Sequence, residues 1–104
     1  MMVLIYITAS DEEEAIAIGD LIVKERLAAC SNVISNMKST YWWQGTLEKD
    51  NEAIIILKTM EENVDKIINR VKEIHSYDNP CIIALPVFKV SDDYLKWIEE
   101  ETNL

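Results

Sequence analysis

The pattern of apolar and polar positions at the start of the chain predicts a strand followed by an amphipathic helix. Residues 2–8 are apolar and mostly β-branched, which is typical of a short buried strand. Ser10 is followed three residues later by Glu13, the pattern of a capping box at a helix N-terminus. Apolar residues then recur with helical spacing, so we expect a helix that ends near Arg26.

The middle of the chain predicts a long antiparallel hairpin. Residues 31–43 are too many and too polar for one fully buried strand, and this favours a strand with one face in water. Gln44–Gly45 predicts the turn, because glycine takes a positive φ at little cost. The return strand, 46–58, is polar near the turn and apolar further on, so the tip should project outward while the far end enters the core.

The first strand of this hairpin reads as one continuous period-2 pattern. Val33, Met37, Tyr41 and Trp43 share one parity along residues 31–43, which would place them on one face of the strand.

The second half of the chain predicts a helix, a strand and a terminal helix. Thr59 and Glu62 form a second capping-box pattern, and apolar residues follow with helical spacing up to position 74. We expect the next strand over residues 81–90, at an edge or with a bulge because Pro86 lies within it. Ser91 then precedes a short amphipathic helix.

The order of these elements predicts an α+β fold. A faint internal repeat supports it, because Thr8 and Thr59 each end a strand, Cys30 and Cys81 each begin one, and both pairs are 51 residues apart. Two such halves joined by a hairpin give a ferredoxin-like βαββαβ sandwich, an antiparallel sheet with helices on one face and here an extra C-terminal helix. The other face of the sheet then needs a cover, which self-association through the hairpin could supply.

Composition narrows the class of protein. A chain of 104 residues suits a single domain spanning 1–104, and 49% hydrophobic with 28% charged residues is ordinary for a globular domain. The net charge of −9 argues against a nucleic-acid partner. No apolar run of about 18 residues is present, so no membrane association is expected. Two cysteines without a secretion signal favour the cytoplasm.

The run Tyr41-Trp42-Trp43-Gln44-Gly45 concentrates aromatic residues at the end of the long strand. Neighbouring residues of a strand point to opposite faces, so one sheet packed on one helical layer cannot bury both Trp42 and Trp43. One of the two is therefore expected to cover a second surface, with a partner subunit as the first candidate.

Three residues are candidate metal ligands. His75, the only histidine, follows the second helix, where a cation near the helix C-terminus is the alternative interpretation. Cys30 and Cys81 would suit copper or zinc together with a histidine, although a free cysteine is more commonly a small core residue. One histidine and two cysteines fall short of a four-ligand zinc site, so a metal centre would need a second chain, or Glu and water.

Other chemistry is sparsely represented. Glu52 and Lys58 are lone charges at the two ends of an apolar segment, where they could hold an interface, line a pocket or lie exposed. No phosphate-binding glycine loop, nucleophile elbow or dinucleotide fingerprint occurs in the sequence. We therefore expect no enzymatic activity.

Several short motifs together resemble the CutA divalent-cation tolerance family over nearly the whole chain. The matching segments are Arg26-Leu27-Ala28-Ala29-Cys30 with Asn32, Ser39-x-Tyr41-x-Trp43-Gln44-Gly45 with Glu52, Lys58-Thr59, His75-x-Tyr77-x-x-Pro80, and Tyr94-x-x-Trp97. The resemblance implies a ferredoxin-like subunit, a tight homotrimer similar in architecture to the PII signalling proteins, and a link to divalent cations and copper.

The resemblance also implies two kinds of site. Copper or another divalent cation would be held by His75, with Cys30 as a further ligand. This sequence has Ile74 and Ser76 beside the histidine, and Cys81 where the family has a carboxylate, so Cys81 becomes a candidate substitute ligand. The alternative is a PII-like sensor or scaffold that binds a small molecule between subunits, with pocket residues Tyr41, Trp43, Glu52, Lys58, His75 and Tyr77.

Overall fold

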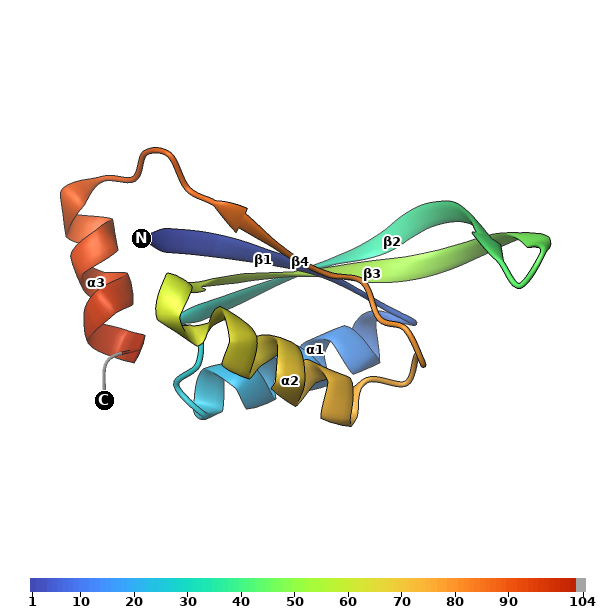
Figure 1. The fold of residues 1–104 in the computed structure, drawn as a ribbon, viewed down its shortest axis with the longest axis horizontal. Helices are drawn as coiled ribbons and strands as arrows, with labels where there is room; N and C mark the ends of the chain where they lie inside the picture. Colours follow the sequence, from blue (N-terminus) through green and yellow to red (C-terminus); the bar gives the residue numbers. More distant parts are fainter. Residues whose placement is uncertain (103–104) are drawn as a thin grey trace.

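The computed structural model describes residues 1–102 as an α+β sandwich, which confirms the predicted fold class. The elements are β1 (Met2–Ala9), α1 (Glu12–Lys24), β2 (Cys30–Trp43), β3 (Thr46–Met60), the 3₁₀ helix η1 (Glu61–Asn63), α2 (Val64–Ile74), β4 (Ile82–Pro86) and α3 (Asp92–Thr102). The four strands form one antiparallel sheet in the order β2-β3-β1-β4. In Figure 1, α1 and α2 lie against one face of the sheet, and α3 stands at the end where β1 begins.

The core lies between the sheet and α1 with α2. On β1, Ile5, Ile7 and Ala9 are fully buried, as are Ile55 and Leu57 on the neighbouring β3. From the helices, the buried apolar side chains that complete this core are Ala15, Ile18, Ile22, Ile67 and Val71. Because side chains alternate along a strand, every second residue of β1 faces these helices and the others face away.

The face of the sheet away from α1 and α2 is also apolar. Ile83 and Leu85 of β4 pair with Tyr6 and Leu4, the outward-facing residues of β1. Ile83, Leu85 and Ile34 of β2 keep 47–51% of their surface exposed. This second face therefore presents large apolar side chains to solvent.

The β2–β3 hairpin projects well beyond β1 and β4 (Figure 1). Trp43 pairs with Thr46 across a two-residue turn in which Gln44 has φ 49° and Gly45 has φ 81°. Two positive φ angles match the turn type that follows the twist of a hairpin, and this confirms the turn predicted at Gln44–Gly45.

A bulge interrupts β2, so the expectation of one continuous face was wrong. Ile34 pairs with Ile54 but Met37 pairs with Glu52, which leaves two residues of β2 opposite Ala53. Asn36, one of the two, has φ 63°. An extra residue reverses the side-chain alternation, so Val33 faces the helices while Met37, Tyr41 and Trp43 face the other side.

The first helix is capped one residue later than predicted. The Asp11 side chain accepts a 2.8 Å hydrogen bond from the Glu14 amide, and Glu14 Oε1 accepts 2.9 Å bonds from the amide and hydroxyl of Ser10. Asp11 is therefore the N-cap, and Glu14, in place of Glu13, reaches back to Ser10, so the box predicted for Ser10 with Glu13 was wrong. The helix ends at Lys24, before Arg26, whose φ of 61° is incompatible with helix continuation.

The predicted cap at Thr59 was also wrong. Thr59 is fully buried in β3, and its hydroxyl donates a 2.6 Å hydrogen bond to the Leu27 carbonyl, so η1 intervenes before α2 begins. The last strand is shorter than predicted and ends at Pro86, on an edge of the sheet as the proline had indicated.

Candidate ligand-binding cleft

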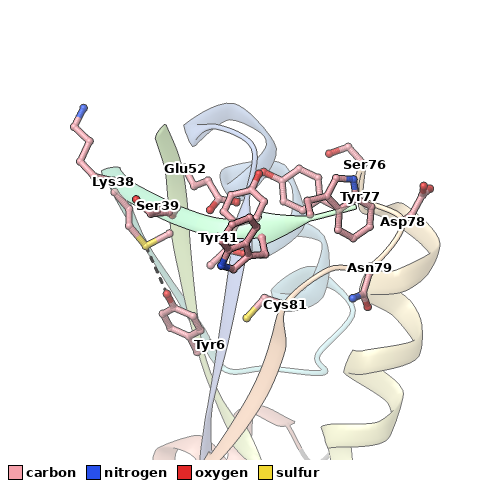
Figure 2. A pocket seen from close by; sticks show the side chains of 15 residues that line it. Tyr6, Lys38, Ser39, Tyr41, Glu52, Ser76, Tyr77, Asp78, Asn79 and Cys81 are labelled. Carbon is pink, nitrogen blue, oxygen red and sulfur yellow. Dashed lines mark hydrogen bonds between the residues drawn. The ribbon is translucent and has the colours of Figure 1, made fainter. Parts of the chain in front are cut away.

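A cavity of about 830 Å³ opens between the hairpin, β1 and the loop that joins α2 to β4 (Figure 2). It is lined by Tyr6 and Thr8 of β1, residues 37–43 of β2, Glu52 of β3 and loop residues that include Tyr77 and Cys81. The projection of the hairpin and the bulge in β2 create this space, because together they turn the aromatic residues of β2 toward the loop.

Glu52 is the buried charged group of the cleft. Only 7% of its surface is exposed, and its Oε2 accepts a 2.8 Å hydrogen bond from the Tyr77 hydroxyl. Burial, together with this hydrogen bond to the carboxylate, raises the pKa of Tyr77 well above its usual range. None of the four ion pairs found within residues 1–102 includes Glu52. The carboxylate is therefore held by a neutral donor alone.

Tyr41 makes a similar contact on the hairpin. Its hydroxyl donates a short hydrogen bond to Asp50. That bond, followed by partial burial and the charges of Asp50, Glu52 and Glu48, raises the pKa of Tyr41 to about 12. The three carboxylates occupy alternate positions of β3 and so face the same side of the strand. Of the three, Glu52 lines the cavity, and Asp50 and Glu48 lie further toward the hairpin tip on the same side of the strand.

His75 positions the loop that carries Tyr77. Its Nδ1 accepts a 3.0 Å hydrogen bond from the Tyr77 amide, and its Nε2 lies 2.7 Å from the Thr8 carbonyl oxygen. Because Nδ1 accepts, Nε2 carries the proton and donates to Thr8, which is the arrangement of a neutral imidazole. The ring centroids of His75 and Tyr77 also lie 4.8 Å apart.

Glu14 fastens the same loop to the first helix. Its Oε2 accepts a 2.9 Å hydrogen bond from the Ser76 amide, and its Oε1 is bonded by Ser10. Partial burial of Glu14 raises its pKa, but the hydrogen bonds from Ser10 and Ser76 together outweigh that effect and lower the pKa to about 2. The backbone amides of Ser76 and Tyr77 are thus both hydrogen-bonded, and these two bonds hold the loop in place.

The three candidate metal ligands do not converge within one chain. His75 contacts the Thr8 carbonyl, and Cys81 lies beside Thr8 at the same end of β1. Cys30 pairs with Lys58 at the other end of the sheet, level with Leu4. Within residues 1–102, no three His, Cys, Asp or Glu side chains gather as they would around a metal ion.

The hydrogen bonds of His75 and the thiol form of Cys81 also disfavour a bound metal ion. Both ring nitrogens of His75 are engaged in hydrogen bonds. Burial raises the pKa of the Cys81 thiol, and a metal binds the thiolate. The residues of a single chain therefore do not fit a copper or zinc centre.

Four of the six predicted pocket residues line the cavity, and His75 is hydrogen-bonded to Thr8 and Tyr77, which both line it. Tyr41, Trp43, Glu52 and Tyr77 do so, whereas Lys58 lies six residues along β3 from Glu52, or about 20 Å in an extended strand. The Lys58 ammonium instead sits 5.6 Å from the ring centroid of Tyr94, in α3. Lys58 therefore lies outside the cavity of its own chain.

Several residues that build the cleft carried no clear signal in the sequence. Glu14 is one of four consecutive acidic residues, 11–14, and the pattern does not single it out. Tyr6 belongs to the predicted strand 2–8, although its hydroxyl reaches Met37 Sδ at 3.5 Å (Figure 2). Trp42 also lines the cavity, but it is 73% exposed, against 42% for Trp43. The prediction that one tryptophan covers a partner surface stays a prediction.

None of the helices in residues 1–102 is long and apolar enough to cross a bilayer.

Comparison with known proteins identifies the family. The family model described as CutA1 divalent ion tolerance protein matches residues 3–101. The divalent-cation tolerance protein CutA of Pyrococcus horikoshii is 44% identical over 98% of this chain and 99% of its own length. Protein CutA 1, chloroplastic, of Oryza sativa subsp. japonica is 36% identical over 97% of this chain, which spans just over half (57%) of that longer relative.

Solved structures agree with the sequence matches. The structure titled periplasmic divalent cation tolerance protein CutA from Archaeoglobus fulgidus superimposes with a TM-score of 0.95 at 39% identity, covering 98% of this chain and 99% of the other. With the family model, the relatives and the fold in agreement, this chain belongs to the CutA1 divalent ion tolerance family.

Proposed function

We propose that this protein serves divalent-cation tolerance as a non-enzymatic homotrimer that binds a small molecule in clefts between its subunits. Glu52 carries the proposal: a buried carboxylate without a cationic partner among residues 1–102 lies in an 830 Å³ cavity beside exposed aromatic rings. A buried charge without an opposite charge is costly to keep, so a ligand that supplies the missing partner is stabilised at this position.

Self-association has support from the uncovered face of the sheet. Ile34, Ile83 and Leu85 form an exposed apolar surface there, and the hairpin that carries Trp42 and Trp43 projects beyond the rest of the sheet, where a neighbouring subunit could cover it. Light scattering coupled to size exclusion should give about three times the chain mass of 12.0 kDa. A stable monomer would contradict the trimer and would leave the cleft without a second subunit.

Ligand binding in the cleft can be tested by thermal shift. A compound that binds only the native state raises the melting temperature, and the rise grows with its concentration relative to its dissociation constant. A screen of charged and neutral metabolites should yield at least one class that stabilises the wild type, with a smaller shift in Trp43→Leu, which removes an aromatic ring from the cleft lining. Equal shifts in both proteins would place the ligand elsewhere.

Copper binding is the second candidate, and the convergence of His75 and Cys81 on Thr8 favours it. An imidazole and a thiol suit copper, but His75 would have to release one hydrogen bond and another subunit would have to complete the site. Titration of the purified protein with copper and with zinc, beside a metal-free control, should show stoichiometric copper binding that His75→Ala abolishes. Unchanged affinity in that variant would rule out His75 as a ligand.

For the compartment, we propose the cytoplasm. The support is that Cys30 and Cys81 are both free and lie at opposite ends of the sheet, so they form no disulfide within one chain. Fractionation of cells that express the full gene, with immunodetection of each fraction, tests the assignment.

A further inference from the structure

We propose that the cleft selects organic cations, namely aliphatic amines whose ammonium group pairs with Glu52 and whose carbon chain lies against Tyr41 and Trp43. This inference rests on the proposed function, because it names the class of ligand for the same cleft.

The charges on the hairpin favour a cation. Glu48, Asp50 and Glu52 pair with Tyr41, Ser39 and Met37, so all three carboxylates lie on the cleft side of β3. The one basic residue in the lining is Lys38, which occupies the opposite parity of β2. Its ammonium donates a 2.7 Å hydrogen bond to Asn51, and Figure 2 shows its side chain extending away from Glu52.

Glu52 has room to accept a second donor. Among residues 1–102 its carboxylate has one hydrogen bond, from Tyr77 to Oε2, which leaves Oε1 for a ligand. An ammonium group supplies both the missing donor and the missing positive charge, and a charge-assisted hydrogen bond is stronger than the neutral one already present.

The hydroxyl oxygens of the two tyrosines offer a ligand hydrogen-bond acceptors and no donors. Both hydroxyls donate to carboxylates, Tyr41 to Asp50 and Tyr77 to Glu52, so their oxygens offer only lone pairs to a ligand. Ligands rich in N–H groups match this surface, whereas phosphates and carboxylates would meet acceptors and negative charge. The chemistry therefore disfavours nucleotides and organic acids.

Aromatic rings complete the match to an amine. Tyr41 and Trp43 line the cavity and remain partly exposed, and the faces of such rings attract ammonium groups and cover alkyl chains. A bare metal ion has no carbon chain that could pack against the rings. It would also find no group of three His, Cys, Asp or Glu side chains among residues 1–102.

The test is isothermal titration calorimetry of the assembled wild-type protein with spermidine, butylamine and 1-butanol. Butylamine and 1-butanol share their carbon chain and differ in charge, so butylamine should bind at least tenfold more tightly. Spermidine should bind more tightly still, and its affinity should fall as salt is added. Citrate and magnesium chloride, titrated separately, should bind at least tenfold more weakly than spermidine.

Two matched variants locate the ammonium. Glu52→Gln keeps the shape of the side chain and removes its charge, so the affinity for spermidine should fall at least tenfold. Glu99→Gln removes the same charge from an exposed position of α3, outside the cavity, and should leave the affinity unchanged. If Glu52→Gln does not assemble, Trp43→Leu provides the second test, with an expected loss of at least fivefold.

The outcomes separate this inference from the proposed function. Equal affinity for butylamine and 1-butanol, or an equal effect of the two glutamine variants, would overturn the amine assignment. Tighter binding of citrate or magnesium that Trp43→Leu weakens would also overturn it, while the cleft would stand as a ligand site. If no ligand of any class binds and none shifts the melting temperature, both the amine assignment and the ligand-binding cleft are wrong.

Discussion

The helix-covered part of the sheet and the projecting hairpin use the same two strands in opposite ways. Where β3 runs beneath α1 and α2, Ile55 and Leu57 are fully buried and pair with strands on both sides. Between Ala53 and the hairpin turn, β3 has only β2 as a neighbour, and its side chains are acidic or exposed. Stability is thus concentrated in one half of the strand, which leaves the other half free to present a binding surface.

The largest expected change in stability comes from a pair of side-chain truncations on β3. Ile55→Ala removes a fully buried side chain and should lower the free energy of unfolding by about 2–5 kcal/mol, because it leaves a cavity in the core. Leu47→Ala removes a half-exposed side chain in the hairpin and should cost less than about 0.5 kcal/mol. Denaturant unfolding at one fixed protein concentration measures both changes.

An equal loss in the two variants would show that the hairpin is as tightly packed as the core. In an oligomer, that result would also indicate that Leu47 is buried between subunits.

A second test addresses how closely α1 approaches the sheet. A Cβ at Gly19 would lie 2.1 Å from Ser31 Oγ and 3.0 Å from Ser31 Cβ. Gly19→Ala should therefore destabilise the protein by about 1–3 kcal/mol, despite the helix preference for alanine, because the helix or Ser31 must shift. Thermal and denaturant unfolding report the loss.

Combining Gly19→Ala with Ser31→Ala removes the 2.1 Å contact and should recover part of the stability. If the double variant is no more stable than the single one, the clash with Ser31 is not the cause.

A third test concerns the cleft itself. Tyr77→Phe removes the hydrogen bond donor of Glu52 and leaves a buried carboxylate unsatisfied, which should cost about 1–2 kcal/mol of unfolding free energy. Tyr41→Phe removes a bond to the exposed Asp50 and should cost less, since water can replace the lost donor. Equal losses would mean that Glu52 reaches solvent once the tyrosine hydroxyl is gone.

The fold was accessible from the sequence where the signals are local. Period-2 and helical spacing located the four strands and the three α-helices, and Gln44-Gly45 located the hairpin turn, because each signal depends on residues only a few positions apart. The bulge at Asn36 was missed, since an inserted residue leaves no mark on a pattern whose polar and apolar positions are already mixed.

The features that sequence reasoning missed depend on distant partners. Thr59 matched a cap locally, but its hydroxyl is used by Leu27, 32 residues away. Tyr41, Trp43, Glu52 and Tyr77 were placed in the cleft by family resemblance, and spacing alone would not have joined residues from two strands and a loop. Glu14 was missed because its partner Ser76 lies 62 residues away in the chain.

A smaller expected change in stability, at Glu14, distinguishes the observed helix cap from the predicted one. The hydrogen bonds of Glu14 lower its pKa from 4.5 to about 2 in the folded protein, so the stability they give is fully present above pH 4.5 and is lost as the pH falls from 4.5 toward 2. Because the side chain is only partly buried, solvent screening reduces the effect to about 1 kcal/mol. At pH 3 the carboxylate is part-way through this range, so between pH 6 and pH 3 the wild type should lose roughly half of that amount more than Glu14→Gln.

Glu13→Gln is the matched control, because Glu13 is the capping partner that the sequence pattern suggested, whereas the structure assigns that part to Glu14. Glu13→Gln should keep the acid sensitivity of the wild type, as measured by urea unfolding at each pH. If Glu13→Gln loses that sensitivity and Glu14→Gln keeps it, the helix is capped in the predicted register. The loop that carries Tyr77 would then lack its link to α1, and the cleft would be less rigid than its contacts indicate.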